Sequence, residues 1–299
     1  MWQIYLTLRY NGGRTLLSDF NITIVGLGLI GGSYAKALRR NNPRNLWAID
    51  KDQYTIKKAI DLNVIDECES MEKVLNKTDI LIMCLYPEDN IKFIRENLTH
   101  LNKNLVITDV CGVKGDMVQR INNIIEDSME FIGGHPMAGR EFNGFDYSDE
   151  NLFMNCNYII TTIPENTEKN IYKVKQIAEL IGSNNIIMTT PRRHDELVAY
   201  TSHLSHVIAN AFVNNTNEEA NDFIGGSFKD VTRVAYLNPY LWSKILINNK
   251  ENVLNEIDKF EENIKIIKEA LKQDDMDILC SQLESGRIKR KEINLRCSH

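Results

Sequence analysis

The chain has 299 residues, of which 43% are hydrophobic, and its formal net charge is −6 at pH 7. This length predicts two globular domains, and the acidic balance, without a sustained Lys/Arg stripe, argues against a nucleic-acid partner. No run approaches the roughly 18 apolar residues of a membrane span. The six cysteines have neither zinc-site spacing nor disulfide density, so we expect reduced thiols, no metal and a cytoplasmic location.

Residues 1–20 precede the first clear strand pattern. They carry Arg9 and Arg14 and lack a sustained apolar segment, so they do not resemble a secretory signal. We expect these residues to form an N-terminal extension to the first domain.

The first apolar run, NITIV, leads directly into the glycine pattern Gly26-x-Gly28-x-x-Gly31. Gly26 permits a tight turn, Gly28 lets the backbone approach a pyrophosphate, and Gly31 lets the following helix pack on the strand. The N–H groups of Leu29 and Ile30, at the start of that helix, then face the phosphates. The pattern predicts a dinucleotide site, and the alternative is an ordinary glycine-rich turn.

A second apolar run, residues 45–49, ends in Asp50. The carboxylate lies about 20 residues beyond the glycine pattern, the spacing at which an acidic residue hydrogen-bonds the ribose hydroxyls and repels a 2′-phosphate. Asp50 therefore favours NAD over NADP, while Lys51 beside it leaves NADP open.

Further apolar runs alternate with helix-like segments in the first half of the chain, at residues 80–85, 105–110, 131–133 and 158–163. This rhythm predicts an α/β domain with a doubly wound, largely parallel sheet of the Rossmann type. Ligands bind outside the carboxyl ends of such strands. We therefore assign Asp109, at the end of the fourth run, to the cofactor side of the site.

The next strand exit carries the segment GGHPMAGRE, which surrounds His135 with small residues. A neutral imidazole with room beside it can accept a proton from a substrate, a role worth about 10²–10⁴ in rate. The alternative is a capping or core histidine in a glycine-rich turn. Its place beside a dinucleotide site favours a catalytic histidine.

The second half of the chain has a helical pattern. Apolar residues recur three and four apart over residues 168–181, 192–213, 240–249, 251–271 and 275–294, and only residues 185–190 resemble a strand. We place the domain boundary near Pro164. The expected organisation is a dinucleotide-binding domain over residues 21–164 and an all-helical domain over residues 165–299.

Four polar residues of the helical half are candidates for a substrate site. His203 and His206 share a helical face, and they lack a third ligand for a metal, so they are expected to line a polar cleft. Lys229 and Arg233 lie four apart, and two cations on one face suit a dicarboxylate. The alternative for these cations is ion pairing on the surface with neighbouring aspartates.

Five motifs in order now indicate a family. GLGLIGGS, DVCGVKG, GGHPMAGRE, TSHLSH and FKDVTR followed by NPYLW make residues 21–275 resemble the prephenate dehydrogenase family. The resemblance implies NAD-dependent oxidative decarboxylation of prephenate to 4-hydroxyphenylpyruvate, a step of tyrosine biosynthesis. It also implies a homodimer formed through the helical domain, with each active site between the two domains.

The resemblance also implies roles for individual residues. His135 matches the family's catalytic histidine, which takes the proton of the ring hydroxyl, and Arg233 matches the arginine that binds a substrate carboxylate. Lys229 and His206 match positions that line the same pocket. The motif does not decide whether His203 or His206 is nearer the substrate, and we rank His206 first.

Three further positions complete the expected site. Glu141 corresponds to an acidic residue near the entrance, and Trp242 to an aromatic residue of the helical domain. Where many relatives have a serine that orients the catalytic histidine and the substrate, this chain has Gly112, preceded by Cys111. Three alternatives remain for this position. The Cys111 thiol or a water molecule could replace the missing hydroxyl, or the turn could simply need a flexible residue.

Other functions remain open at this point. An arogenate dehydrogenase would use the same motifs, because arogenate differs from prephenate only in its side chain. Another NAD-linked oxidoreductase, such as a hydroxy-acid dehydrogenase, shares the glycines but gives no reason for the later motifs. A non-catalytic dinucleotide-sensing protein is the alternative from a different class.

Overall fold

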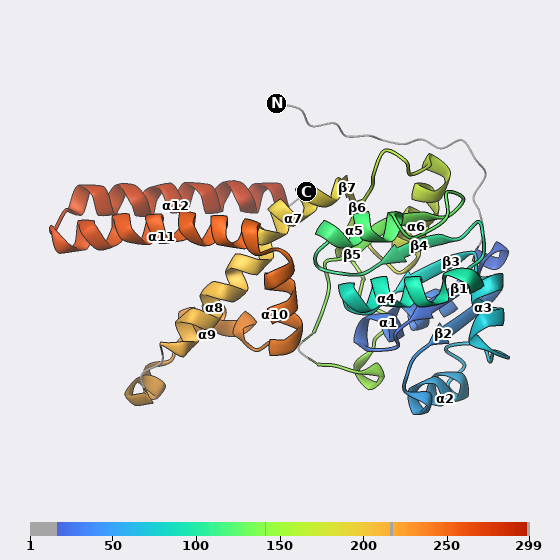
Figure 1. The fold of residues 1–299 in the computed structure, drawn as a ribbon. Coiled ribbons are helices and arrows are strands. Elements are labelled where there is room, and N and C mark those ends of the chain that lie inside the picture. The colour runs from blue at the N-terminus through green and yellow to red at the C-terminus, as the bar shows by residue number, and fades with distance from the viewer. Residues whose placement is uncertain (1–16, 141, 216–217, 298–299) are drawn as a thin grey trace.

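The computed structural model describes residues 17–140, 142–215 and 218–297. A sheet covered by helices on both faces forms the first part of the molecule, and a series of helices forms the second (Figure 1). The α11–α12 hairpin extends away from the sheet, so the molecule is elongated. No helix among the described residues has both the length and the apolar character needed to cross a membrane.

The described sheet has seven strands in the spatial order β2-β1-β3-β4-β5-β6-β7. Their bounds are β1 Asn21–Val25, β2 Asn45–Ile49, β3 Ile80–Met83, β4 Val106–Asp109, β5 Glu130–Pro136, β6 Asn157–Thr161 and β7 Asn185–Thr189. All neighbouring pairs are parallel except β5 and β6. The outward growth from β1 in both directions confirms the expected doubly wound, largely parallel sheet.

The helices of the sheet domain bury opposite faces of the strands. They are α1 Leu29–Arg39, α2 Gln53–Asp61, α3 Met71–Lys77, α4 Pro87–Asn97, α5 Gly115–Asn122 and α6 Glu168–Leu180. Successive strand residues alternate between two buried clusters: Ile80 and Ile82 join the cluster under α1 and α6, while Leu81 and Met83 join the cluster under α4 and α5. Burial on both faces explains why these strands read as continuous apolar runs.

The sheet domain is longer than the sequence predicts at both ends. Strand β7 pairs in parallel with β6, and Ile171 and Val174 of α6 are buried in the same cluster as the central strands. A boundary near Pro164 would separate both elements from the core that they complete, so we move it to Thr190. Leu17 is also buried in this core, although residues 1–20 were expected to form an extension.

The helical part begins directly after β7. Thr190 accepts a hydrogen bond from Arg193 N, and Pro191 occupies the first turn, which is the usual start of a helix. The elements are α7 Pro191–Val198, a π-helical segment Ala199–His203, α8 Leu204–Asn214, α9 Gly226–Thr232, α10 Pro239–Asn248, α11 Lys250–Lys272 and α12 Met276–Cys297. The expected helices are all present.

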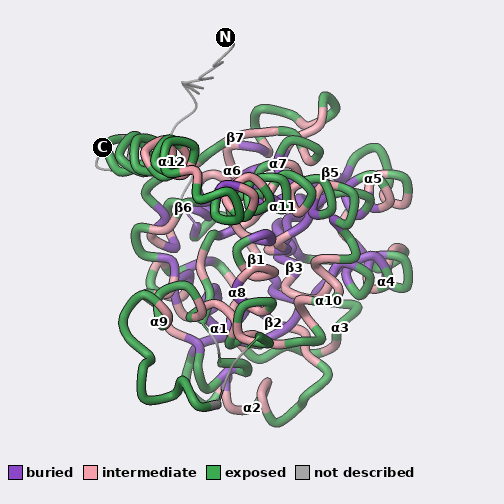
Figure 2. Tube along the Cα trace, turned by 90° about the vertical axis from the view of Figure 1, so that its left-hand side faces the viewer, coloured by how far each residue is buried: buried purple, intermediate pink, exposed green. Residues whose placement is uncertain are grey.

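The two parts differ strongly in burial. Figure 2 shows buried residues concentrated around the sheet, whereas the α11–α12 hairpin is mostly exposed. Large apolar side chains of this hairpin are exposed, namely Leu254, Ile264, Leu271, Met276, Ile278, Leu283, Ile288, Ile293 and Leu295. Apolar side chains exposed in this number are available for contact with another molecule.

Candidate active site

The turn after β1 has the geometry that a dinucleotide requires. Gly26 has φ +95°, and a Cβ atom at Gly31 would lie 1.8 Å from Gly26 O, so larger residues would clash at both positions. A Cβ atom at Gly28 would meet nothing within 4 Å, which leaves the backbone open to a ligand. Helix α1 starts here without a side-chain cap, so its first N–H groups, including those of Leu29 and Ile30, are available to phosphate.

Asp50 lies at the mouth of the same turn. Its Oδ2 accepts a hydrogen bond from Leu27 N at 2.7 Å, and its Oδ1 accepts one from Asp52 N at 2.9 Å. Each carboxylate oxygen retains a second acceptor site. The two backbone bonds therefore fix the carboxylate beside the glycine turn, where it can still bind ribose hydroxyls.

Asp109 does not line the cofactor side as expected. Its side chain has no exposed surface and forms an ion pair with Lys114, whose Nζ lies 2.6 Å from Asp109 Oδ2. Asp109 also accepts hydrogen bonds from the backbone of Cys111 and Gly134. These contacts leave no surface for a ligand, so Asp109 and Lys114 instead join the exit of β4 to the strand that carries His135.

His135 lies near the end of β5, at the edge of a hydrogen-bonded series that the sequence analysis missed. His135 Nδ1 lies 2.8 Å from His194 Nε2, and His194 Nδ1 lies 2.7 Å from Asp195 Oδ1. The other ring nitrogen, His135 Nε2, lies near Gly112, at 3.8 Å from the position of a Cβ atom there. Only the adjacency of a histidine and an aspartate in PRRHDELV hints at this pair in the sequence.

The surroundings of His135 favour its neutral form. Burial is the main cause that lowers the pKa of His135 well below its usual value, and His194, Lys114 and His203 add to the effect. Burial also lowers the pKa of His194. A neutral imidazole can accept a proton at neutral pH, which is what a general base requires.

Asp195 and His203 connect the helical part to the turn after β4. The Asp195 carboxylate accepts hydrogen bonds from Lys114 N at 2.8 Å and Gly115 N at 2.6 Å, at the start of α5. His203 is buried, contacts Asn249 Nδ2 through Nδ1 at 3.2 Å, and hydrogen-bonds the backbone of Gly112. Burial lowers the pKa of His203 to about 4. His203 therefore lies behind the candidate site as a link between the two parts.

His206 is the more accessible of the two histidines. It is half-buried, and its ring stacks on Trp242 with 3.6 Å between ring centroids. Burial lowers the pKa of His206, and the nearby Arg233 guanidinium adds to this. The rings of Trp242 and His203 are nearly perpendicular, with 6.1 Å between their centroids. The structure thus brings Trp242, His206 and Arg233 together, and the closer approach of His206 to the substrate stays a prediction.

The two expected substrate-binding cations are exposed. Lys229 lies on α9, and Arg233 follows its last residue in a 3-10 turn, Arg233–Ala235. Within residues 17–140, 142–215 and 218–297, neither cation forms an ion pair with an acidic residue. The alternative of surface pairing with neighbouring aspartates is therefore wrong for the described residues. Glu141, the expected entrance residue, lies outside them.

The position that lacks a serine can accommodate one. A Cβ atom at Gly112 would meet its nearest atoms, on His135 and Ile245, at 3.8–3.9 Å, which is ordinary contact. The Cys111 thiol does not replace the missing hydroxyl, because its partners are Asn90 Nδ2 and Leu85 O. Burial also raises the pKa of Cys111 well above its usual value.

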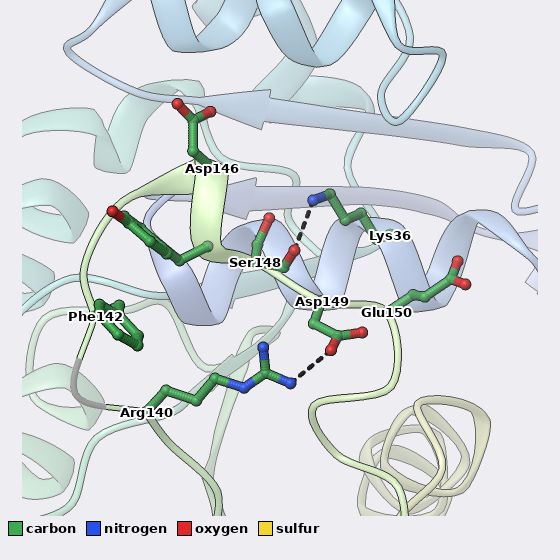
Figure 3. Close-up of a pocket in the computed structure, with 8 residues that line it drawn as sticks. Lys36, Arg140, Phe142, Asp146, Ser148, Asp149 and Glu150 are labelled. Atoms are coloured by element: carbon green, nitrogen blue, oxygen red, sulfur yellow. Dashed lines mark hydrogen bonds and ion pairs between the residues drawn. The ribbon is translucent and has the colours of Figure 1, made fainter.

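A separate surface pocket of about 480 Å³ lies between α1 and the segment after β5 (Figure 3). Its lining residues are Lys36, Arg140, Phe142, Asp146, Tyr147, Ser148, Asp149 and Glu150. Arg140 is paired with Asp149, and Lys36 donates to Ser148 O. None of the expected site residues in the described part of the chain lines this pocket, and Arg140 and Lys36 already have partners, so the pocket does not replace the site around His135.

Comparisons with known proteins agree with this arrangement. The family model described as "Prephenate dehydrogenase, nucleotide-binding domain" matches residues 34–187, and the model described as "Prephenate dehydrogenase, dimerization domain" matches residues 190–285. The prephenate dehydrogenase of Bacillus subtilis (strain 168) is 30% identical over 286 residues, which cover 92% of this chain and 76% of the relative.

Two solved structures share the whole fold. The prephenate dehydrogenase from A. aeolicus, in complex with hydroxyphenyl propionate and NAD+, is 34% identical with a TM-score of 0.83, covering 92% of this chain and 98% of the other. Synechocystis arogenate dehydrogenase is 26% identical with a TM-score of 0.80, and the match covers 91% of this chain and 99% of the other. With a sheet domain, a helical domain and motifs that match along both, this chain belongs to the prephenate dehydrogenase family.

Proposed function

We propose that this chain catalyses the NAD-dependent oxidative decarboxylation of prephenate to 4-hydroxyphenylpyruvate. The observation that carries the proposal is a series of contacts between the two domains. His135 lies beside Gly112, Gly112 is hydrogen-bonded to His203, His203 meets Trp242, and Trp242 stacks on His206 beside Arg233. A proton acceptor and a carboxylate-binding cation thus belong to one continuous group of residues.

The residues after β1 and β2 fit NAD. Gly26, Gly28 and Gly31 would hold the pyrophosphate at the start of α1, and Asp50 would bind the ribose and disfavour a 2′-phosphate. When bound, NAD accepts the hydride that leaves C4 of the substrate ring. The relative from A. aeolicus, whose structure contains NAD+, supports this cofactor.

His135 would transfer the proton. Its Nε2 accepts the proton of the C4 hydroxyl as the C4–H bond breaks, so that the hydroxyl becomes a ketone. The ring carboxylate then leaves as carbon dioxide, and the electrons of its C–C bond complete the aromatic ring. The protonated imidazole returns the proton to the phenolate oxygen. One hydride and one carbon dioxide have left the substrate, and His135 is neutral again.

Arg233, Lys229 and His206 would hold the substrate. Prephenate carries two carboxylates, and an arginine can grip one through a planar pair of N–H donors while a lysine adds a second positive charge. Trp242 fixes the ring of His206 by stacking. His206 would then supply a polar contact between the two cations and the proton-transfer site.

We also propose a homodimer formed through the helical domain. The exposed apolar side chains of α11 and α12 would be covered by a second copy, since few residues of these helices are buried within one chain. The match to a family model described as a dimerization domain supports this assembly.

A spectrophotometric assay tests the proposed activity. The purified protein is incubated with NAD or NADP and with prephenate or arogenate, and absorbance is followed at the wavelength of the reduced cofactor. We expect turnover with prephenate and NAD. Reduced-cofactor binding without turnover of either substrate would contradict catalysis and favour the dinucleotide-sensing alternative.

Arogenate is the second candidate substrate. Synechocystis arogenate dehydrogenase shares the fold over 91% of this chain, so the fold is compatible with either compound. The ratio of kcat/KM for arogenate to that for prephenate decides between them. A ratio above one would make this chain an arogenate dehydrogenase and leave the roles of His135 and Asp50 unchanged.

A further inference from the structure

The hydrogen bond between His135 and His194 requires a defined arrangement of protons. A neutral imidazole has one N–H donor and one bare nitrogen that accepts. The bond joins His135 Nδ1 to His194 Nε2 at 2.8 Å, so one of these two nitrogens must carry a proton and the other must be bare. Which of them is bare determines which nitrogen of His135 is free to act as a base.

Asp195 decides the direction of this bond. Its Oδ1 lies 2.7 Å from His194 Nδ1, and an ionised carboxylate only accepts hydrogen bonds. His194 Nδ1 therefore carries the proton, and His194 Nε2 is bare. His135 Nδ1 must then be the donor, which leaves the lone pair of His135 Nε2 free on the side of Gly112.

The opposite arrangement would need a doubly protonated His194. Its ring is fully buried, and burial lowers the pKa of His194 by more than the hydrogen bond to Asp195 raises it, while nearby Lys114 acts in the same direction as burial. The groups around the two rings are Lys114, Asp109, Asp195 and His203, and Lys114 is already paired with Asp109. A second buried cation between His135 and Lys114 is therefore disfavoured.

Asp195 is itself held firmly in place. It is buried, and its two oxygens accept the N–H groups of Lys114 and Gly115, while its backbone carbonyl accepts Asn249 Nδ2 at 2.8 Å. These bonds prevent the carboxylate from rotating away from His194. The same group thus fixes the start of α5 and the proton on His194 Nδ1.

We propose that His194 and Asp195 are positioning residues that hold His135 in its Nδ1–H tautomer, so that Nε2 is the base. The proposal rests on the proposed function, because it concerns the same histidine. It adds that the tautomer is set from the first turns of α7, in the helical domain, whereas His135 itself lies on β5 of the sheet domain.

The direct test is ¹⁵N NMR of the full-length protein with labelled histidine, at a pH above neutrality. The signal of His135 is identified by its loss in His135→Asn. We expect the long-range ¹⁵N–¹H pattern of an Nδ1–H ring for His135 in the unmodified protein. An Nε2–H ring would overturn the proposal, and this result requires neither substrate nor turnover.

Two substitutions of His194 separate positioning from packing. His194→Gln keeps a side-chain carbonyl at about the distance of Nε2, where it can accept from His135 Nδ1–H, and His194→Leu removes the acceptor. We expect kcat to fall by roughly 10²–10⁴ in His194→Leu, because a positioned general base contributes about this much to the rate and acts only in the right tautomer, with KM for NAD unchanged. His194→Gln should restore most of kcat.

The matched control is His100→Leu, at an exposed histidine at the end of the 3-10 turn Leu98–His100, and it should change neither kcat nor the NMR pattern of His135. Equal losses of kcat in His194→Gln and His194→Leu, with the tautomer of His135 unchanged in both, would assign His194 to packing alone and overturn the proposal. An Nδ1–H ring in a protein that turns over neither substrate would instead leave the tautomer assignment intact and contradict only the proposed function.

Discussion

The sheet domain and the helical domain contribute to the candidate site in different ways. In the sheet domain, alternate strand residues enter two buried clusters, and His135 extends from a strand inside this frame. In the helical domain, few residues are buried within the chain, and the two cations Lys229 and Arg233 lie on exposed short elements. The sheet domain thus fixes His135, the proposed proton acceptor, whereas the two cations proposed to bind the substrate depend on a less constrained scaffold.

The contrast also explains the position of the interdomain contacts. Asp195 and His203 come from the part of the helical domain that is buried, and both bind the backbone at residues 112–115. Beyond these contacts, burial decreases toward the α11–α12 hairpin. Substitutions in the sheet domain and in the helical domain should therefore differ in their effects on kcat, on the unfolding free energy and on KM.

The largest effect is expected for loss of the proton acceptor. His135→Asn should lower kcat by roughly 10²–10⁴, because proton transfer by a positioned side chain contributes about this much to the rate. Steady-state kinetics measure kcat, and fluorescence titration with NADH measures cofactor affinity, which should be unchanged. A variant that retains kcat would remove His135 from the mechanism. The two domains would then differ only in how well their residues are packed.

The next effect concerns stability. Phe131 is fully buried in the sheet domain. Phe131→Ala should therefore lower the unfolding free energy of the protein by about 3–5 kcal/mol. Leu283 of α12 is 63% exposed, so Leu283→Ala should change the unfolding of an isolated chain by less than about 0.5 kcal/mol.

Urea denaturation at two protein concentrations tests this pair of variants. The loss in Phe131→Ala should be the same at both concentrations, whereas any loss in Leu283→Ala should depend on concentration because it would reflect association. Equal, concentration-independent losses in the two variants would show that α12 is buried within its own chain and would contradict the comparison of the domains.

A smaller effect is expected for Arg233→Ala. Hydrogen bonds to charged groups contribute about 1.5–3 kcal/mol, so kcat/KM for the substrate should fall roughly tenfold to hundredfold, mainly through KM. The matched control is Arg192→Ala, an exposed arginine on α7 that pairs with Glu196, and it should leave KM unchanged. Similar KM values in the two variants would exclude Arg233 from the substrate site.

Replacement of Asp50 should mainly change the choice of cofactor. Asp50→Ala removes the acceptor for the ribose hydroxyls and the repulsion of a 2′-phosphate, so the preference for NAD over NADP should narrow by about tenfold. The measurement is kcat/KM for each cofactor at saturating substrate. An unaltered ratio would reject the ribose assignment, although Asp50 could still support the glycine turn through Leu27 N.

The smallest effect is a displacement of the pH profile. The lowered pKa of His135 keeps the active neutral form below pH 6.5, so kcat/KM should stay level through that pH and fall only at lower values. In the unfolded chain the same group titrates near 6.5, so the unfolded state binds more protons below that pH. The unfolding free energy should consequently decrease as the pH falls from about 6.5 toward the folded pKa.

Profiles of kcat/KM and of the unfolding free energy between pH 4.5 and 8 check this expectation. Their midpoints are compared with the unperturbed histidine pKa of about 6.5. His135→Asn should lose its share of the pH dependence of stability. A kinetic midpoint at about 6.5 would mean that His135 is more hydrated than its position on β5 indicates.

The parts of the fold that follow from local chemistry could be predicted from the sequence. The glycine turn needs a positive φ at Gly26 and close packing at Gly31, and both requirements are visible as residue types. The buried parallel strands appear as apolar runs because both faces are covered. The sequence does not join β7 to the sheet domain, because this partly exposed strand carries too weak a pattern to show that it pairs with β6.

The site could be predicted only where one residue identifies its chemistry. His135 and Asp50 stand at strand exits, which the sequence can locate. The orientation of a side chain at such an exit is not visible, so Asp109 was assigned to the cofactor although Lys114 holds it in the interior. His194 and Asp195 lie in a polar first turn of α7, and nothing local shows that they meet β5 and α5 across the boundary.

The bonds of His194 and Asp195 across the boundary also constrain the engineering of chimeras within the family. The apparent joint at Thr190 lies only a few residues before this pair, so a helical half transplanted at that point would bring its own residues against His135 and Lys114. A crossover placed after Asp195 would instead keep the histidine, its partners and the start of α5 from a single parent. Recombination libraries cut at the visible domain border would thus divide one functional unit between two parents.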